Sequence, residues 1–141
     1  MASGGLVFGS STLRRMPLSQ DLLTAYENAD YVVFAHPELV LRIGEPSRRL
    51  DALLEHEGAS TAAYVTAAAS AVATLADLVA AAGYPSYSGE GRDPDGDRDA
   101  EQSLLVIGIY RANAEELGRL FGQNAIVFIE KGRAPELVVL R

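Results

Sequence analysis

The chain has 141 residues, of which 48% are hydrophobic and 22% are charged, and it contains no cysteine. This length predicts one domain that buries roughly two-thirds of its unfolded surface, so the core needs no covalent support. The lack of cysteine excludes disulfides, thiolate metal sites and cysteine nucleophiles. Twelve Lys and Arg against 19 Asp and Glu give a net charge of −7, which disfavours nucleic-acid binding because that function needs a basic face.

The N-terminal segment is rich in Gly and Ser and is predicted to be a flexible tail over residues 1–17. Its short apolar stretch, 6–8, precedes the Arg14-Arg15 pair, which reverses the order found in a secretory signal. The longest weakly polar run, 62–83, is mostly alanine and lacks the bulk of a membrane-spanning helix. We therefore expect a soluble cytoplasmic protein with a single domain over residues 18–141.

The first half of the domain alternates between helix and strand signals. In chain order, the predicted elements are a helix over 20–28, strands over 31–34 and 39–43, a helix over 46–58 and a strand over 61–66. Ser19 is a suitable N-cap for the first helix, and Pro46 fits the first turn of the second, where its missing N–H is harmless. The turn at residues 36–38 predicts that the first two strands form an antiparallel hairpin.

The second half continues this alternation. Its predicted elements are a helix over 70–82, a short edge strand over 84–87, a polar loop over 88–99, a strand over 103–109, a helix over 113–121 and a closing hairpin of strands 125–129 and 136–140. The near-continuous apolar run of 103–109 predicts a central strand buried on both faces. We expect Leu105, Ile107, Val127 and Leu117 to be buried together, with Leu120 and Phe121 also directed inward. The predicted fold class is α/β (α+β), with a single mixed, partly antiparallel sheet covered by three to four helices.

Several short motifs occur in a characteristic order. They are Ala25-Tyr26, 31–33, 41–44, 62–67, 89–96, 101–106 and 121–127. With these motifs, residues 22–140 resemble the bacterial family named domain of unknown function 3293. The resemblance implies no particular activity. Members of that family usually continue the strand ending at Thr66 into an Asn-Pro-containing loop, whereas this chain runs through alanines into the helix. The resemblance therefore implies a shortened loop and, if that loop lines a pocket in relatives, a reduced or inactive site.

An acidic stretch within residues 88–101 is a candidate metal site. Its carboxylates alternate along the chain at Asp93, Asp95, Asp97 and Asp99. Alternating carboxylates with a glycine can wrap Ca²⁺ or Mg²⁺, which prefer oxygen ligands. Gly96 stands between the second and third Asp instead of after the third, however, and the usual bidentate Glu is missing. A solvated turn rich in Asp, Gly and Pro is the favoured interpretation.

Polar side chains near strand ends form a second candidate site, for a ligand or partner. They are Thr66, Glu90, Arg92, Glu101, Gln123 and Asn124. Glu90 and Glu101 are candidates for an acid and base pair or for Mg²⁺ ligands, with solvated surface carboxylates as the alternative. Asn124 is alternatively a helix cap. Because loops leave the core at strand ends, we expect any site to lie where residues 88–101 meet Thr66 and Gln123-Asn124.

No catalytic residue is predicted. Ser103 lacks the glycines of a nucleophile elbow, and His36 and His56 are expected to be ordinary surface residues. The sequence favours a small binding or protein-interaction module whose partner is a protein or a small molecule. The alternative is a divalent-metal-binding domain, or a metal-assisted enzyme, that uses the acidic stretch.

Overall fold

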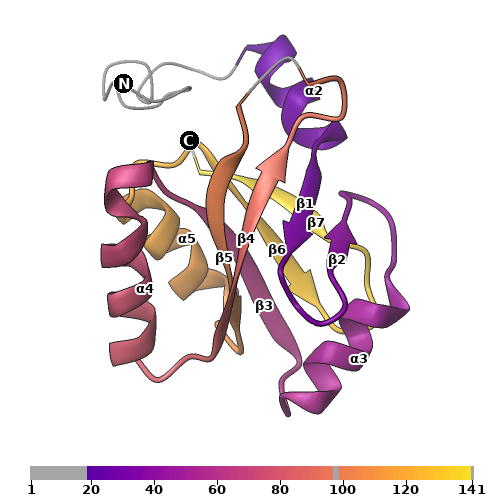
Figure 1. Ribbon diagram of the computed structural model, residues 1–141, viewed down its shortest axis with the longest axis vertical. Coiled ribbons are helices and arrows are strands. Elements are labelled where there is room, and N and C mark those ends of the chain that lie inside the picture. The colour runs from indigo at the N-terminus through magenta and orange to yellow at the C-terminus, as the bar shows by residue number, and fades with distance from the viewer. Residues whose placement is uncertain (1–18, 97–98, 141) are drawn as a thin grey trace.

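The most apolar strand of the chain lies in the middle of a seven-stranded sheet (Figure 1). The computed structural model describes residues 19–96 and 99–140, so the predicted tail over 1–17 lies outside the described residues. The strands are β1 (Asp30–Val33), β2 (Leu39–Leu41), β3 (Thr61–Thr66), β4 (Ser86–Arg92), β5 (Glu101–Ile107), β6 (Ala125–Glu130) and β7 (Glu136–Val139). Their order across the sheet is β2-β1-β4-β5-β3-β6-β7, which confirms that β5 is central.

Neighbouring strands pair antiparallel throughout the described sheet. The predicted α/β architecture of one sheet covered by helices is confirmed, and so are the β1–β2 and β6–β7 hairpins. The sequence also predicts some parallel pairing, but the described strands form no parallel pair. Antiparallel pairing suits this chain because short turns join β1 to β2 and β6 to β7.

The predicted edge strand over 84–87 is wrong, and the predicted polar loop over 88–99 is wrong in its first part, 88–92. The chain instead forms β4 from Ser86 to Arg92, and β4 lies between β1 and β5. Pro85 immediately precedes the strand, so its missing N–H removes no bond from the ladder. Gly89 and Gly91 lower the strand signal of the sequence, because glycine has no side chain to pack.

Residues 19–96 and 99–140 include four α-helices. They are α2 (Gln20–Asn28), α3 (Arg48–His56), α4 (Val72–Ala81) and α5 (Arg111–Leu120), with a 3₁₀ turn (Ala69–Ala71) before α4. As predicted, Ser19 caps α2, since its hydroxyl accepts from the Leu22 N–H at 3.1 Å. The predicted start of α3 needs correction: Ser47 is its N-cap and accepts from the Leu50 N–H, which places Pro46 before the helix.

The two faces of the sheet bury separate apolar clusters. One face packs against α4 and α5, and the other packs against α3, which contributes Leu50 and Leu54. Leu105, Ile107 and Val127 are buried together on the α3 face, as predicted. The predicted position of Leu117 in this cluster is wrong, and so is the predicted inward direction of Leu120. Phe121 is directed inward, as predicted.

The correction on α5 concerns the helix phase. Leu117 lies against the opposite cluster with Phe121, and Leu120 is 69% exposed. The helix buries Ala114 and Gly118 instead. Small residues at these positions bring the α5 backbone close to the sheet, and this close approach turns Leu120 toward solvent.

Helix α3 joins the two edges of the curled sheet at one end. The chain after β2 meets the β6–β7 turn, where the Gly44 N–H donates to the Pro135 carbonyl at 2.9 Å. From α3, Arg49 donates to two carbonyls of the β1–β2 turn, and the Asp51 carboxylate accepts from the Gly132 N–H at 3.0 Å. In Figure 1, α3 lies toward the bottom of the sheet, and α2 lies at the top.

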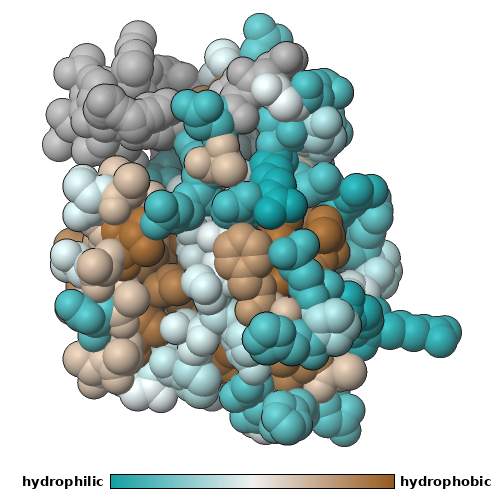
Figure 2. Space-filling model, viewed as in Figure 1, coloured by the Kyte–Doolittle hydropathy of each residue, from teal (hydrophilic) through white to brown (hydrophobic). Residues whose placement is uncertain are grey.

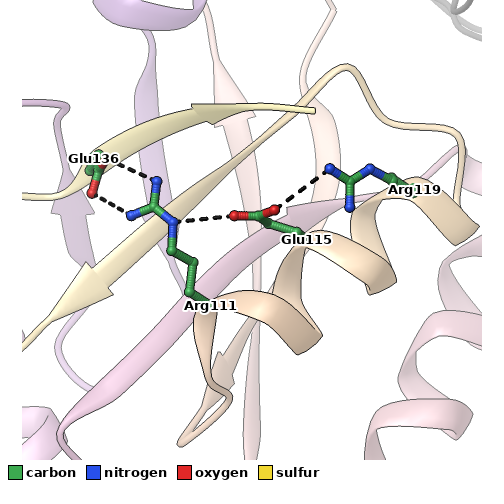
Figure 3. Close-up of polar contacts among 4 residues, drawn as sticks. All are labelled: Arg111, Glu115, Arg119 and Glu136. Carbon is green, nitrogen blue, oxygen red and sulfur yellow. Dashed lines mark hydrogen bonds and ion pairs between the residues drawn. The ribbon is translucent and has the colours of Figure 1, made fainter. Parts of the chain in front are cut away.

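Ion pairs link α5 to β7 (Figure 3). The Arg111 guanidinium donates to both carboxylate oxygens of Glu136, at 3.0 and 3.2 Å, and to Glu115 at 3.2 Å. Glu115 also pairs with Arg119 one turn further along the helix. The guanidinium lies 5.7 Å from the centre of the Phe128 ring, so it contacts the sheet through a cation–π interaction as well.

The surface mixes hydrophilic and hydrophobic side chains (Figure 2). On the β1–β2 hairpin, Phe34 is 40% exposed and Val40 is 44% exposed. His36 and His56 are exposed, as predicted. Within residues 19–96 and 99–140, no helix combines the length and the hydropathy needed to cross a bilayer.

Candidate functional site

A cavity of about 550 Å³ lies between α2 and the sheet. Helix α2 lies at the end of the sheet away from α3 (Figure 1). Helix α2 contributes Leu22, Ala25 and Tyr26 to its wall. The opposite wall comes from the start of β1, β5 and β6 and from the end of β3 and β4. The cavity is therefore built from strand ends and one helix.

Gly91 creates the hollow in the sheet beneath this cavity. In the ladder it is the partner of Tyr31 on one side and Glu101 on the other, so the three residues share one face. A Cβ atom at position 91 would meet no atom within 4 Å. The contrast with Gly89 is sharp, because a Cβ there would lie 2.1 Å from the Val32 carbonyl oxygen. One glycine allows close packing, and the other leaves open space.

Two buried tyrosines form the aromatic part of the wall. The rings of Tyr31 and Tyr64 meet edge to face, with centroids 5.3 Å apart and planes at 78°. Tyr31 donates its hydroxyl hydrogen to the Tyr26 carbonyl, and Tyr64 donates to the Val32 carbonyl at 3.0 Å. Burial raises the pKa of both hydroxyls above the ordinary tyrosine value, so both stay neutral at physiological pH.

A chain of hydroxyls runs beside the tyrosines. Ser103 is buried and donates to the Glu101 carbonyl at 3.1 Å. Its oxygen lies 2.9 Å from the Thr66 hydroxyl. Either hydroxyl can be the donor in that pair. This arrangement satisfies Ser103 structurally and provides no base to activate it as a nucleophile.

The structure brings four of the six predicted strand-end residues to the cavity: Thr66, Arg92, Glu101 and Gln123. Glu90 and Asn124 do not line it. Glu90 accepts from Arg92 at 2.5 Å, and the largely buried Asn124 donates to the Tyr26 hydroxyl at 3.4 Å. Glu90 opposes Gln102 in the ladder, one position from Glu101, so the two glutamates start from opposite faces of the sheet. Whether these residues bind a ligand or partner stays a prediction.

The acidic stretch forms a turn. The Asp93 carboxylate accepts from the Asp95 N–H at 3.0 Å, and the Asp93 carbonyl accepts from the Gly96 N–H at 2.9 Å. Asp93 and Asp99 line the cavity, and Asp97 lies outside the described residues. In the part of the chain that the structure describes, no three Asp, Glu or His side chains form a group that could hold a metal ion.

Sequence reasoning missed the residues that give the cavity its shape: Tyr26, Tyr31, Tyr64 and Gly91. One signal was present. A buried tyrosine in an apolar strand needs a partner for its hydroxyl, and a glycine within a strand often marks close approach of another group. Which tyrosine lies beside which glycine depends on the order of the strands in the sheet, and that order is a property of the fold.

The 67–69 segment, where the chain departs from the pattern of its suggested relatives, also lines the cavity. A comparison with curated proteins found no match, and neither did a comparison with solved structures. A family model matches residues 59–126, which include β3 and β5 and the connection between them. That family is described as Protein of unknown function (DUF3293), and it is the one that the motifs of the chain predict.

Proposed function

We propose that this domain binds a small organic molecule in the cavity between α2 and the strand ends. The observation that carries the proposal is the cavity itself, at about 550 Å³. Ligand pockets in proteins typically measure roughly 300–1,000 Å³ and combine apolar walls with a few polar groups. A site at the open end of a curled sheet resembles the mouth of a barrel, which is a common place for such pockets.

The cavity wall has the required mixture of chemistry. Its apolar part includes Leu22, Ala25, Val127 and Leu137, and its polar part includes Thr66, Glu101 and Gln123. Apolar side chains supply affinity through burial of ligand surface, and the polar groups fix its orientation. None of the residues of α2 is buried, so moving this helix to admit a ligand exposes little apolar surface.

A protein partner and a divalent metal are the alternatives that the sequence leaves open. The described part of the acidic stretch supports a metal site weakly, because Asp93 already accepts a turn hydrogen bond. Melting the protein with EDTA, Ca²⁺ or Mg²⁺ tests this alternative, since an ion that binds only the folded state raises its stability. A cytoplasmic location likewise stays a prediction.

The direct test uses a variant that fills the cavity. Gly91→Leu places a side chain in the open space above β4, and Ser88→Leu adds the same side chain at an exposed position of that strand. Thermal melts with a panel of small amphipathic compounds should identify at least one that stabilises the wild type and Ser88→Leu but not Gly91→Leu. If no compound stabilises the wild type, or if Gly91→Leu responds equally, the proposed function is wrong.

A further inference from the structure

The charged side chains around the cavity are mostly acidic. Among the described lining residues, the charged ones are Arg92, Asp93, Asp99 and Glu101. The guanidinium of Arg92 is already held by Glu90, at 2.5 Å. Carboxylates therefore outnumber cations by three to one among these described lining residues, which favours a positively charged ligand.

The hydrogen-bonding groups of the wall lead to the same conclusion independently. Tyr31 and Tyr64 each donate their only hydroxyl hydrogen to a backbone carbonyl. Ser103 donates to the Glu101 carbonyl, and a further hydrogen bond joins the Ser103 and Thr66 hydroxyls. The two tyrosine hydroxyls therefore still offer lone pairs, so they can accept hydrogen bonds but not donate them. A ligand suited to this wall must be rich in donors.

Glu101 is the carboxylate best placed to meet such a donor. Its partner in the ladder is Gly91, so its side chain starts beside the open space and on the same face as Tyr31. The Tyr31 and Tyr64 rings stand on the same face, and aromatic rings attract cations. A carboxylate, acceptor hydroxyls and aromatic rings together form a typical environment for an ammonium group.

We propose that the ligand is an organic amine, bound as its ammonium ion. The ammonium group lies between Glu101 and the hydroxyls of Tyr31 and Tyr64, and the apolar body of the ligand packs between α2 and the Val127 and Leu137 side chains. This inference rests on the proposed function, because it assigns a chemical class to the ligand of the same cavity.

Three probes of matched shape separate charge from size: 3-phenylpropylamine, 3-phenylpropan-1-ol and 3-phenylpropionate. Titration calorimetry at neutral pH should show the amine binding at least about tenfold more tightly than the alcohol, as expected for a hydrogen bond to a charged group. The carboxylate should bind most weakly. Gly91→Leu should abolish binding of the amine, and Ser88→Leu should leave it unchanged.

Glu101→Gln keeps the size of the side chain and removes its charge. This variant should weaken binding of the amine about tenfold while leaving that of the alcohol nearly unchanged. Glu116→Gln is the matched control, because it removes one charge from an exposed position of α5. The wild-type preference for the amine needs no variant, so the test holds even if Glu101→Gln fails to fold.

The two proposals fail in different ways. If the alcohol or the carboxylate binds as tightly as the amine, and Gly91→Leu blocks it, the cavity binds ligands but the assignment to amines is overturned. If Glu101→Gln folds and binds the amine normally, the assignment is also overturned. If none of the probes binds and the wider panel yields no ligand either, the proposed function fails, and the amine with it.

Discussion

Gly89 and Gly91 lie on the same strand and the same face, and the structure predicts opposite responses to alanine. A Cβ atom at position 89 would lie 2.1 Å from the Val32 carbonyl oxygen and 3.2 Å from the Tyr64 hydroxyl. At position 91 it would meet nothing within 4 Å. Neither glycine has a positive φ, so backbone strain does not distinguish the two substitutions. The comparison therefore isolates the effect of packing.

The expected magnitudes follow from these contacts. Ordinary van der Waals contact begins at 3.4 Å, so Gly89→Ala must separate the Cβ and the Val32 oxygen by 3.4 − 2.1 = 1.3 Å. That shift overpacks the sheet, at a cost of about 1–3 kcal/mol, and weakens the Tyr64–Val32 hydrogen bond, at about 1–3 kcal/mol more. The lower flexibility of alanine in the unfolded chain returns only about 0.5–1 kcal/mol. The net destabilisation is therefore about 1–5.5 kcal/mol.

For Gly91→Ala only the gain from lower unfolded-state flexibility applies, so the variant should be as stable as the wild type or up to about 1 kcal/mol more stable. Urea denaturation followed by circular dichroism measures both free energies of unfolding. Equal stability of Gly89→Ala and the wild type would refute the close approach of β1, β4 and Tyr64. A large loss in Gly91→Ala would show that the space above Gly91 is filled.

Three further predictions concern the core, the tyrosines and the ion pairs. Leu105→Ala should cost about 2–5 kcal/mol in urea denaturation, because Leu105 is fully buried in the central strand; a cost below about 0.5 kcal/mol would contradict that position. Burial raises the pKa of Tyr31, so the folded state keeps this proton at pH values above about 10, where the unfolded chain loses it, and stability should fall as the pH rises. Tyr31→Phe should reduce that slope by up to about 1.4 kcal/mol per pH unit, and an unchanged slope would show that the hydroxyl is accessible. Arg111→Ala should lower the free energy of unfolding by about 1 kcal/mol, since its ion pairs are exposed, and this loss should shrink at high salt. A loss that does not change with salt concentration would show that Arg111 stabilises the fold only by packing on Phe128.

The elements with strong local signals could be predicted from the sequence. The continuous apolar run in β5 predicts a central strand, and Ser103 to Ile107 are all buried. The Ser19 cap and the closing hairpin also depend on neighbouring residues alone, and both are confirmed. These predictions succeed because capping, turn formation and burial on both faces leave a local pattern in the chain.

The predictions that failed depend on contacts between distant segments. The sequence of β4 predicts a loop because its glycines and polar residues lack strand propensity. In the structure, β1 and β5 supply hydrogen-bonding partners along β4. The sequence of α5 predicts that Leu120 faces inward. In the structure, Gly118 closely approaches Leu140 and Ile126, so a different face of the helix is buried. Local propensity is a weak determinant wherever tertiary contacts compete with it.

For the candidate site, the location could be predicted more readily than the shape. Strand ends collect polar side chains, and this rule alone directs attention to Thr66, Glu101 and Gln123, which line one cavity. The aromatic wall follows only from the sheet order, which places Tyr31 beside Gly91 and brings Tyr64 onto the same face. Glu90 shows the limit of the rule, since its place in the ladder directs it away from Glu101.

The two ends of the curled sheet differ in how much they contribute to stability, and the proposed ligand cavity lies at the end that contributes less. At one end, α3 buries Leu50 and Leu54 and is held to both sheet edges by hydrogen bonds. At the other, α2 buries no residue completely and covers a hollow above Gly91. Substitutions at the α3 end remove buried apolar surface, whereas those beneath α2 alter a space that the core does not need. This separation is why variants at Gly91 and Glu101 can test binding in a protein that remains folded.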